Sequence, residues 1–382
     1  MKLKCTPDDF CVTELTDRRS TDGGFCFYQL NKSGIGTLEA LQMFQRSRNI
    51  AASQVSHGGL KDRHAVTSQF LTVRNGPRAD YEDELFCLRY LGQTSTAYGA
   101  ADIVGNRFEI VIRSLANEFC DRISDHVQSI AEHGFPNYFD EQRFGSLGAS
   151  GEFIAEKWCK KDYERALWLA LADHNHHDNG AERKQKEVLR NLWGRWSECK
   201  QQLDRSHRRS IVTYLVDHPE GFRKAFALLN QNLRGLYLSA FQSAVWNRML
   251  AAVYSEAQVE QEESRTLTIG DAELPFPIER PDRSELPLPS ARCKGLSADM
   301  REICDRALQP YEMTLNQMKL SFPRDRWFSR GQRSTTVQPR EVSADPAVDE
   351  IYAGKQKLTL KFDLPRGSYA TMMIKAVTGG QA

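Results

Sequence analysis

The sequence predicts an α+β fold in which a domain built on a mixed sheet is interrupted by a largely helical insertion. Three observations predict it: strand patterns lie near both ends of the chain, residues 152–255 between them are mostly helical in pattern, and 382 residues suit two domains. We place the sheet-containing domain at 1–155 and 335–382 and the insertion at 156–334.

The first ~115 residues alternate strand and helix signals, and a helical pattern follows them. A helix is expected from Thr37, as its N-cap, through Leu38, Leu41 and Phe44, which share one side, and a second helix is expected over 118–133 before a glycine. Three segments have the aromatic or alternating composition of strands: Phe25–Leu30, Gln69–Val73 and Arg107–Arg113.

The rest of the chain contains the proposed insertion and a final strand. Leu228–Met249 is strongly helical in pattern, with Gly235 as a break or a close packing point, and prolines exclude a continuous helix over Leu274–Pro289. Arg183–Arg209 carries an excess of basic residues. Lys357–Leu364 alternates apolar and polar residues with a period of two, which predicts a strand with one buried face.

Composition excludes several classes of protein. Lys and Arg number 51 and Asp and Glu 50, so the chain is not a polycationic nucleic-acid coat, although a local basic cleft remains possible. No apolar run approaches the ~18 residues of a membrane helix, and the N-terminus lacks the apolar core of a signal peptide. Nine cysteines without a C-x-x-C pair argue against a zinc or disulfide framework. We expect a cytoplasmic protein with no metal, no membrane association and a monomeric state.

A first polar segment surrounds Asp62. Gly58 and Gly59 allow a tight turn, and Asp62 is then flanked by the cations Lys61 and Arg63, with a histidine following. Neighbouring positive charges lower the pKa of a carboxylate, which suits a nucleophile or an anchored ion pair better than a general acid. The alternative is an ordinary surface turn with a solvated aspartate.

Two further segments combine aromatic, amide and basic side chains. Phe135–Gly145 contains Asn137, Phe139 and Arg143, the residue types that stack on bases, bind their polar edges and contact phosphates. Leu364–Thr371 follows the best predicted strand and includes a glycine and a tyrosine. Both segments are also compatible with structural turns.

Other motifs give weaker evidence for a function. His174, His176, His177 and Asp178 would suit a metal-dependent hydrolase, but their spacing is not that of ligands on one helix face. No phosphate-binding loop of the G-x-x-x-x-G-K-[ST] type and no G-x-S-x-G elbow is present.

Taken together, four segments in order resemble the TruD family of tRNA pseudouridine synthases. They are Asp8-Asp9-Phe10-x-Val12-x-Glu14, Gly59-Leu60-Lys61-Asp62-x-x-Ala65-x-Thr67, Asn137-Tyr138-Phe139-x-x-Gln142-Arg143-Phe144-Gly145 and Gly367-Ser368-Tyr369-Ala370-Thr371. The resemblance implies the pseudouridine synthase fold, a mixed, mainly antiparallel sheet with helices around a central cleft, and a family-specific α/β insertion domain.

The resemblance also implies an activity and a set of site residues. The activity is isomerisation of a specific uridine in tRNA, in bacterial members uridine 13 of the D-stem, to pseudouridine without a cofactor. Asp62 falls on the catalytic aspartate of the family, and it would add to C6 of the uracil, attack C1′ or assist a glycal route. The implied substrate contacts are Phe10, Asn137, Tyr369, Lys61, Phe139, Arg143 and Lys4. A non-catalytic RNA-binding protein or RNA chaperone on the same fold is the alternative function.

Overall fold

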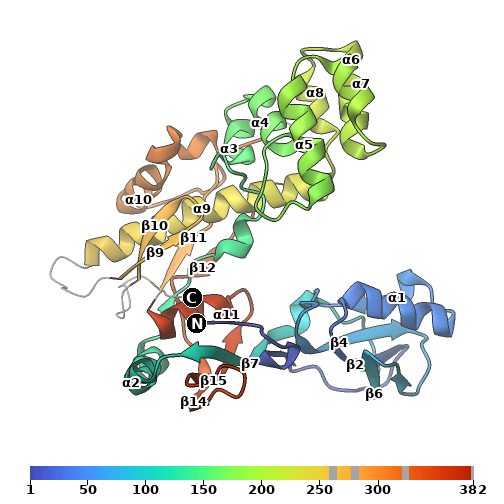
Figure 1. Ribbon diagram of the computed structural model, residues 1–382, viewed down its shortest axis with the longest axis vertical. Helices are drawn as coiled ribbons and strands as arrows, with labels where there is room; N and C mark the ends of the chain where they lie inside the picture. Colours follow the sequence, from blue (N-terminus) through green and yellow to red (C-terminus); the bar gives the residue numbers. More distant parts are fainter. Residues whose placement is uncertain (258–264, 277–283, 321–326, 380–382) are drawn as a thin grey trace. The chain divides into compact units, whose positions relative to one another are not determined.

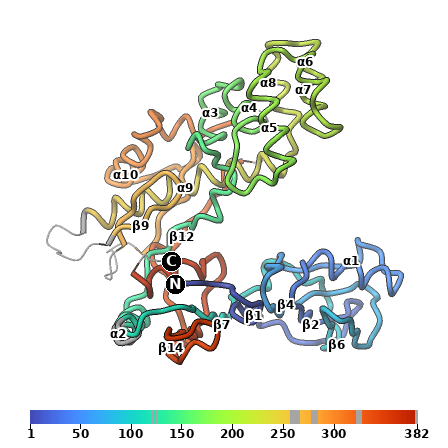
Figure 2. The backbone as a smooth tube through the Cα atoms, viewed as in Figure 1, coloured from blue at the N-terminus to red at the C-terminus, as the bar shows by residue number. Residues whose placement is uncertain are grey.

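The computed structural model divides the chain into two compact units. Of the residues that the structure describes, those up to Phe135 and those from Val337 onward belong to the first unit, and those between them belong to the second. The residues that the structure describes are 1–257, 265–276, 284–320 and 327–379. In Figures 1 and 2 both chain ends, blue and red, belong to the first unit, while the green to orange middle forms the second.

A mixed sheet forms the framework of the first unit. Within the described residues nine strands pair in the order β14-β15-β7-β1-β4-β2-β6-β5, with β3 beside β4. Only β1 and β4 run parallel, and the other pairs are antiparallel. The α+β prediction is therefore confirmed. The strands are β1 (Phe10–Thr16), β2 (Phe25–Ser33), β3 (Val55–His57), β4 (Val66–Arg74), β5 (Tyr81–Glu82), β6 (Phe86–Thr94), β7 (Ile103–Leu115), β14 (Arg340–Val348) and β15 (Gln356–Pro365).

The strands expected from the sequence all occur, each extended at one or both ends. The clearest case is β15, where Leu358, Leu360, Phe362 and Leu364 are all buried. The residues between them are half-buried or exposed. The period of two therefore identified the buried face correctly, because successive side chains of a strand point to opposite faces of its sheet.

Three α-helices accompany the sheet: α1 (Thr37–Arg48), α2 (Asn117–His133) and α11 (Ala370–Thr378). Ala40, Leu41 and Phe44 of α1 join the buried side chains of β2, β4 and β6 in one hydrophobic cluster. The expected N-cap was wrong, because Gly36 occupies that position and Thr37 is the first residue of the helix. Leu38 is 52% exposed and does not belong to the buried face.

Helices dominate the second unit, as the sequence predicted for 152–255 (Figure 1). The helix α9 runs from Gln231 to Ala257 through Gly235, which does not break it, and contacts α3, α10, β10 and β11. The elements are α3 (Ile154–Cys159), α4 (Tyr163–Leu171), α5 (Gly180–Leu192), α6 (Trp196–Gln202), α7 (His207–Asp217), α8 (Phe222–Ala227), α9, β9 (Arg265–Ile269), β10 (Ala272–Phe276), β11 (Glu285–Pro287), α10 (Ala298–Leu308) and β12 (Gln332–Ser334). A short ladder joins β8 (Phe135–Pro136) to β13 (Thr336–Val337).

The contact-based units and the predicted domains divide the chain at different points. The units change at 135/136 and 336/337, whereas the sequence places the domain limits at 155/156 and 334/335. The assignment of 156–334 as an insertion domain stays a prediction. Of the helices in the described ranges, none combines the length and apolar character needed to cross a bilayer.

Gly105 illustrates how closely the strands β7 and β15 approach each other. A Cβ atom at this position would lie 2.4 Å from the carbonyl oxygen of Leu364 on β15. We expect Gly105→Ala to lower the free energy of unfolding by about 1–3 kcal/mol, because the backbone must shift. Denaturant unfolding checks this, with Gly99→Ala as the control, since nothing lies within 4 Å of a Cβ there. Equal effects of the two substitutions would contradict the expectation.

Candidate active site

The turn that carries Asp62 joins β3 to β4 and is held to the sheet by polar side chains. The Nε2 atom of Gln69 donates a hydrogen bond to the carbonyl oxygen of Gly59 at 3.0 Å. The amide of Lys61 donates to Oγ1 of Thr37 at 3.0 Å, and that hydroxyl donates to Oε1 of Gln69 at 2.8 Å. Because Thr37 and Gln69 are buried, these bonds fix the main chain of the residues that precede Asp62 in the turn.

The ammonium of Lys61 points toward the sheet. Its Nζ atom lies 2.5 Å from Oδ1 of Asn106 and 3.1 Å from Oε2 of Glu14, which is 1% exposed. The other Glu14 oxygen accepts hydrogen bonds from the Tyr98 hydroxyl at 2.9 Å and the Phe70 amide at 3.2 Å. A buried carboxylate needs such partners, and here they turn Lys61 into an anchor of the turn.

The carboxylate of Asp62 remains accessible, with its side chain 40% exposed. Its Oδ2 atom lies 2.5 Å from Nζ of Lys4, and Oδ1 accepts a hydrogen bond from the His64 amide at 3.1 Å. Burial alone would raise the pKa of Asp62, but the Lys4 ammonium and the His64 amide outweigh it, so the pKa lies below its usual range. The pKa of Asp62 is thus lowered, as the sequence predicted, but the cation that pairs with the carboxylate is Lys4. Arg63 pairs with Glu39 instead.

Lys4 also contacts the aromatic residue that the first motif singles out. Its Nζ atom lies 4.3 Å from the centre of the Phe10 ring, within the range of a cation–π interaction. The ring of Phe10 meets Phe108 edge-on at 6.4 Å, and Phe108 stacks on Phe362 at 5.4 Å. These three residues on β1, β7 and β15 place an aromatic row next to the Lys4–Asp62 pair.

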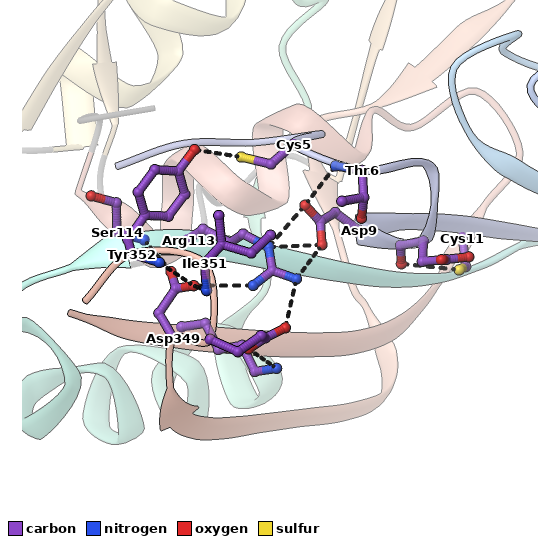
Figure 3. A network of polar contacts seen from close by, with 12 residues as sticks. Cys5, Thr6, Asp9, Cys11, Arg113, Ser114, Asp349, Ile351 and Tyr352 are labelled. Atoms are coloured by element: carbon purple, nitrogen blue, oxygen red, sulfur yellow. Dashed lines mark hydrogen bonds and ion pairs between the residues drawn. The ribbon is translucent and has the colours of Figure 1, made fainter. Parts of the chain in front are cut away.

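A buried ionic network around Arg113 supports this arrangement (Figure 3). The guanidinium of Arg113 lies 2.8 Å from Oδ1 of Asp9, 3.1 Å from Oδ1 of Asp349 and 3.0 Å from Oε1 of Glu350. The side chains of Arg113, Asp9 and Asp349 are at most 6% exposed. The network ties the residue before Phe10 to the end of β7 and to the turn after β14.

The same network holds the N-terminal segment that carries Lys4. The backbones of Lys2 and Arg113 exchange two hydrogen bonds of 2.9 Å, and Asp9 accepts a hydrogen bond from the Thr6 amide at 3.0 Å. Lys4 therefore lies between two fixed points, with a backbone φ of 54°. Its side chain reaches Asp62 because tertiary contacts hold this terminal segment in place.

Tyr369 lies on a turn at one end of β7. Gly367 has a φ of 86°, a conformation that favours glycine, and the amide of Arg366 donates to the Val104 carbonyl at 3.3 Å. Tyr369 is half-buried and is the N-cap residue of α11. Since Asn106 contacts Lys61 on the same end of β7, the two motif turns share one end of that strand.

In the second unit, Asn137 is buried in a hydrogen-bond network. Its Nδ2 atom donates to the Ser334 carbonyl at 2.7 Å, and its Oδ1 atom accepts from Arg333 at 2.6 Å. The Arg333 guanidinium also lies 4.0 Å from the centre of the Phe139 ring. The amide of Asn137 is thus held in one orientation by its neighbours.

Phe139 and Arg143 belong to the same cluster. Asn247 bonds to both the amide and the carbonyl of Phe139, at 2.8 and 2.9 Å. Arg143 donates to the Ser239 hydroxyl at 2.8 Å, lies 5.3 Å from the Phe139 ring centre and lines a cavity of about 420 Å³. The third motif is therefore a compact structural unit, with Arg333 as a component that no sequence spacing indicated.

The other candidates from the sequence have structural contacts. Lys186 in the basic run binds both oxygens of Asp178 at 2.9 Å, and Arg208 pairs with Glu182. Within the described ranges, no group of three or more His, Cys, Asp or Glu side chains is arranged to hold a metal ion.

Sequence reasoning assigned no supporting role to four residues that hold the motifs in place: Glu14, Lys32, Arg113 and Arg333. Glu14 and Lys32 had a detectable signal, because each is a charged residue that continues the alternation of buried side chains along its strand. Arg113 alternates with the buried residues of β7, and Arg333 binds a residue far away in the chain, so spacing does not reveal their contacts.

Comparison with known proteins agrees with the four motifs. Residues 1–272 match the family model of tRNA pseudouridine synthase D (TruD). The chain is 27% identical to a probable tRNA pseudouridine synthase D 1 of Methanococcus maripaludis over 99% of both chains. It is 28% identical to the tRNA pseudouridine synthase D of Leptospira interrogans, over 98% of this chain and 95% of that protein.

The fold is also found in a solved structure. The crystal structure of the putative tRNA pseudouridine synthase D from Methanosarcina mazei matches with a TM-score of 0.77 and 23% identity, over 99% of this chain and 93% of that one. With the family match covering more than half of the sequence, the chain belongs to the TruD family of tRNA pseudouridine synthases, an isomerase family.

Proposed function

We propose that this protein converts a specific uridine of tRNA, uridine 13 of the D-stem, to pseudouridine, with Asp62 as the catalytic nucleophile. The family membership supports the reaction class, since the related proteins of M. maripaludis and L. interrogans are named as tRNA pseudouridine synthases. The observation that carries the assignment of Asp62 is its exposed carboxylate, paired with Lys4 and lying on a rigidly held turn.

The reaction is an isomerisation and needs no external reactant. The N1–C1′ glycosidic bond breaks, the uracil turns, and a C5–C1′ bond forms, while the hydrogen at C5 leaves as a proton and N1 gains one. Asp62 acts by addition to C6, by attack at C1′ or by assisting departure of uracilate to a glycal. Each route starts from the ionised carboxylate, the form that Lys4 and the His64 amide favour.

The target base must leave the RNA stack before it reaches Asp62. Extrusion costs a few kcal/mol, and stacking on aromatic rings offsets it by about 1–3 kcal/mol per base. We assign that stacking to Phe10 and Tyr369 in the first unit. Asn137, Phe139 and Arg143 in the second unit are proposed as further RNA contacts on the basis of their motif.

Phosphate binding is proposed to involve the exposed cations of two basic runs. In the run 183–209, four arginines donate to backbone carbonyl groups, which leaves Lys184 and Arg205 as exposed candidates; the four are Arg183, Arg190, Arg195 and Arg209. The second run is the basic segment 324–340 of the sequence, which lies partly outside the described residues.

The pH dependence of the rate follows from the pKa of Asp62. Because this pKa lies below the usual value near 3.9, the nucleophile is ionised throughout the pH range in which tRNA is intact. We expect kcat to show no loss from protonation of Asp62 between about pH 5 and 8. Single-turnover rates across this range check the expectation, and an acid limb with a midpoint above about pH 5 that moves on substitution of Lys4 would contradict it.

The experiment that tests the function is isomerisation of total unmodified tRNA by the purified protein in EDTA. Pseudouridine is mapped by carbodiimide labelling and primer extension. A new stop in the D-stem supports the proposal, whereas tRNA binding without any stop favours the RNA-binding alternative. A stop elsewhere in the tRNA would retain the reaction and overturn uridine 13 as its target.

A further inference from the structure

A lysine occupies a buried position where the sequence pattern of β2 calls for an apolar side chain. Cys26, Tyr28 and Leu30 alternate along this strand and are at most 1% exposed. Lys32 continues the same alternation and is only 2% exposed. Burial of an ammonium group is costly, and a hydrophobic residue of similar volume is often at least as stabilising at such a site.

The Lys32 ammonium has its bonding partners on the main chain. Its Nζ atom donates to the Ile35 carbonyl at 2.8 Å and to the Asp62 carbonyl at 2.7 Å. Among the ion pairs of residues that the structure describes, none involves Lys32. The two bonds connect the segment before α1 with the backbone of Asp62 itself.

We propose that Lys32 is a positioning residue that holds the main chain of Asp62 in the geometry required for attack on the substrate. This inference rests on the proposed function of Asp62. Gln69 and Thr37 hold the residues before it in the turn, and Lys4 binds its carboxylate, but Lys32 binds the carbonyl group of Asp62.

Electrostatics adds to this role. Burial lowers the pKa of Lys32, and the charge of Asp62 opposes that shift, so the two groups attract each other. Lys4 is 34% exposed and accessible to solvent, whereas Lys32 approaches the turn from inside the protein. Lys32 therefore acts on Asp62 from inside the protein, away from any surface that could bind RNA.

The test compares Lys32→Met with Leu30→Val in steady-state kinetics with tRNA as the substrate. Lys32→Met removes the ammonium and keeps a side chain of similar length, and we expect kcat to fall about 10- to 100-fold, since a displaced reacting group costs rate. The KM and the Kd for tRNA should stay within about twofold of the parent, because Lys32 is buried. Leu30→Val destabilises the same strand and keeps the ammonium, so its kcat should match the parent.

A second readout is independent of activity. Hydrogen exchange of the amides from Gly59 to His64 should accelerate in Lys32→Met and not in Leu30→Val. Lys32→Gln keeps one donor group and should give an intermediate kcat; should Lys32→Met not fold, Lys32→Gln decides the question. Parent-like kcat and exchange in a folded Lys32 variant would overturn the inference.

The activity of Asp62→Asn separates this inference from the proposed function. If Asp62→Asn is active, the proposed function fails, and so does the positioning role of Lys32, whatever the exchange rates. If Asp62→Asn is inactive while Lys32→Met has full activity, only the inference about Lys32 fails.

Discussion

Replacement of Asp62 by asparagine is expected to reduce pseudouridine formation at least about 10⁴-fold, the scale on which loss of a nucleophile acts in other enzymes. The amide is not an anionic nucleophile, although it matches the carboxylate in size. Binding of tRNA should stay within about threefold, because the substitution removes a negative charge that lies beside Lys4. Isomerisation of tRNA and a filter-binding Kd measure the two effects.

The matched control for this variant is Asp80→Asn. Asp80 is also exposed, and like Asp62 it pairs with one cation, Arg89, and accepts a hydrogen bond from one backbone amide, that of Tyr90. Loss of these contacts should leave the rate unchanged. Turnover at the normal rate by Asp62→Asn would show that the nucleophile is another group, and equal losses in both variants would indicate an effect on folding.

Replacement of Arg113 by methionine is expected to lower the free energy of unfolding by about 3–5 kcal/mol, because it leaves buried carboxylates without a counter-charge. Asp9 and Asp349 have side chains at most 1% exposed and both bind Arg113. Guanidinium unfolding measures the change. The control is Arg107→Met on the same strand, since Arg107 forms a two-bond pair with Asp363 but is 56% exposed. Arg107→Met should lower the free energy of unfolding by less than about 1 kcal/mol.

The Arg113 network also predicts a pH dependence. Burial raises the pKa of Asp9 and of Asp349, but hydrogen bonds with Arg113 and with backbone amides more than compensate, so both values lie below the usual range. A lowered pKa contributes stability that is present above about pH 4 and lost as the pH falls through the folded-state values. The advantage of the parent over Arg113→Met should therefore shrink below about pH 4, and a constant difference down to pH 2 would contradict this.

Local patterns predicted four of the nine strands of the main sheet, namely β2, β4, β7 and β15. The alternation over Lys357–Leu364 identified both the strand β15 and its buried face, because a period of two is a property of the single strand. The start of α1 was less accurate. Threonine is a residue type that is common at N-caps, but the Thr37 hydroxyl bonds to Gln69 and Lys61 near the turn. The N-cap of α1 is Gly36 instead.

For the candidate site, the sequence proposed individual residues but not the groups that contact them. The turn around Asp62 and the lowering of its pKa were expected, but the responsible cation is Lys4, 58 residues away in sequence. The adjacent lysine, Lys61, binds Glu14 and Asn106 instead. Neighbours in a tight turn point in different directions, so sequence proximity was a poor guide to which charge faces the carboxylate.

The sequence by itself determined the α+β class, four of the strands, the helical middle and the four motifs that identify the family, because periodicity and short-range spacing are encoded in the linear chain. Only the tertiary structure decided which groups surround Asp62. Lys4 reaches it through a segment held by Arg113, and Lys32 reaches it from a strand whose pattern calls for an apolar residue. Contacts of this kind depend on the register between strands distant in sequence, and that register is set by packing of the whole sheet.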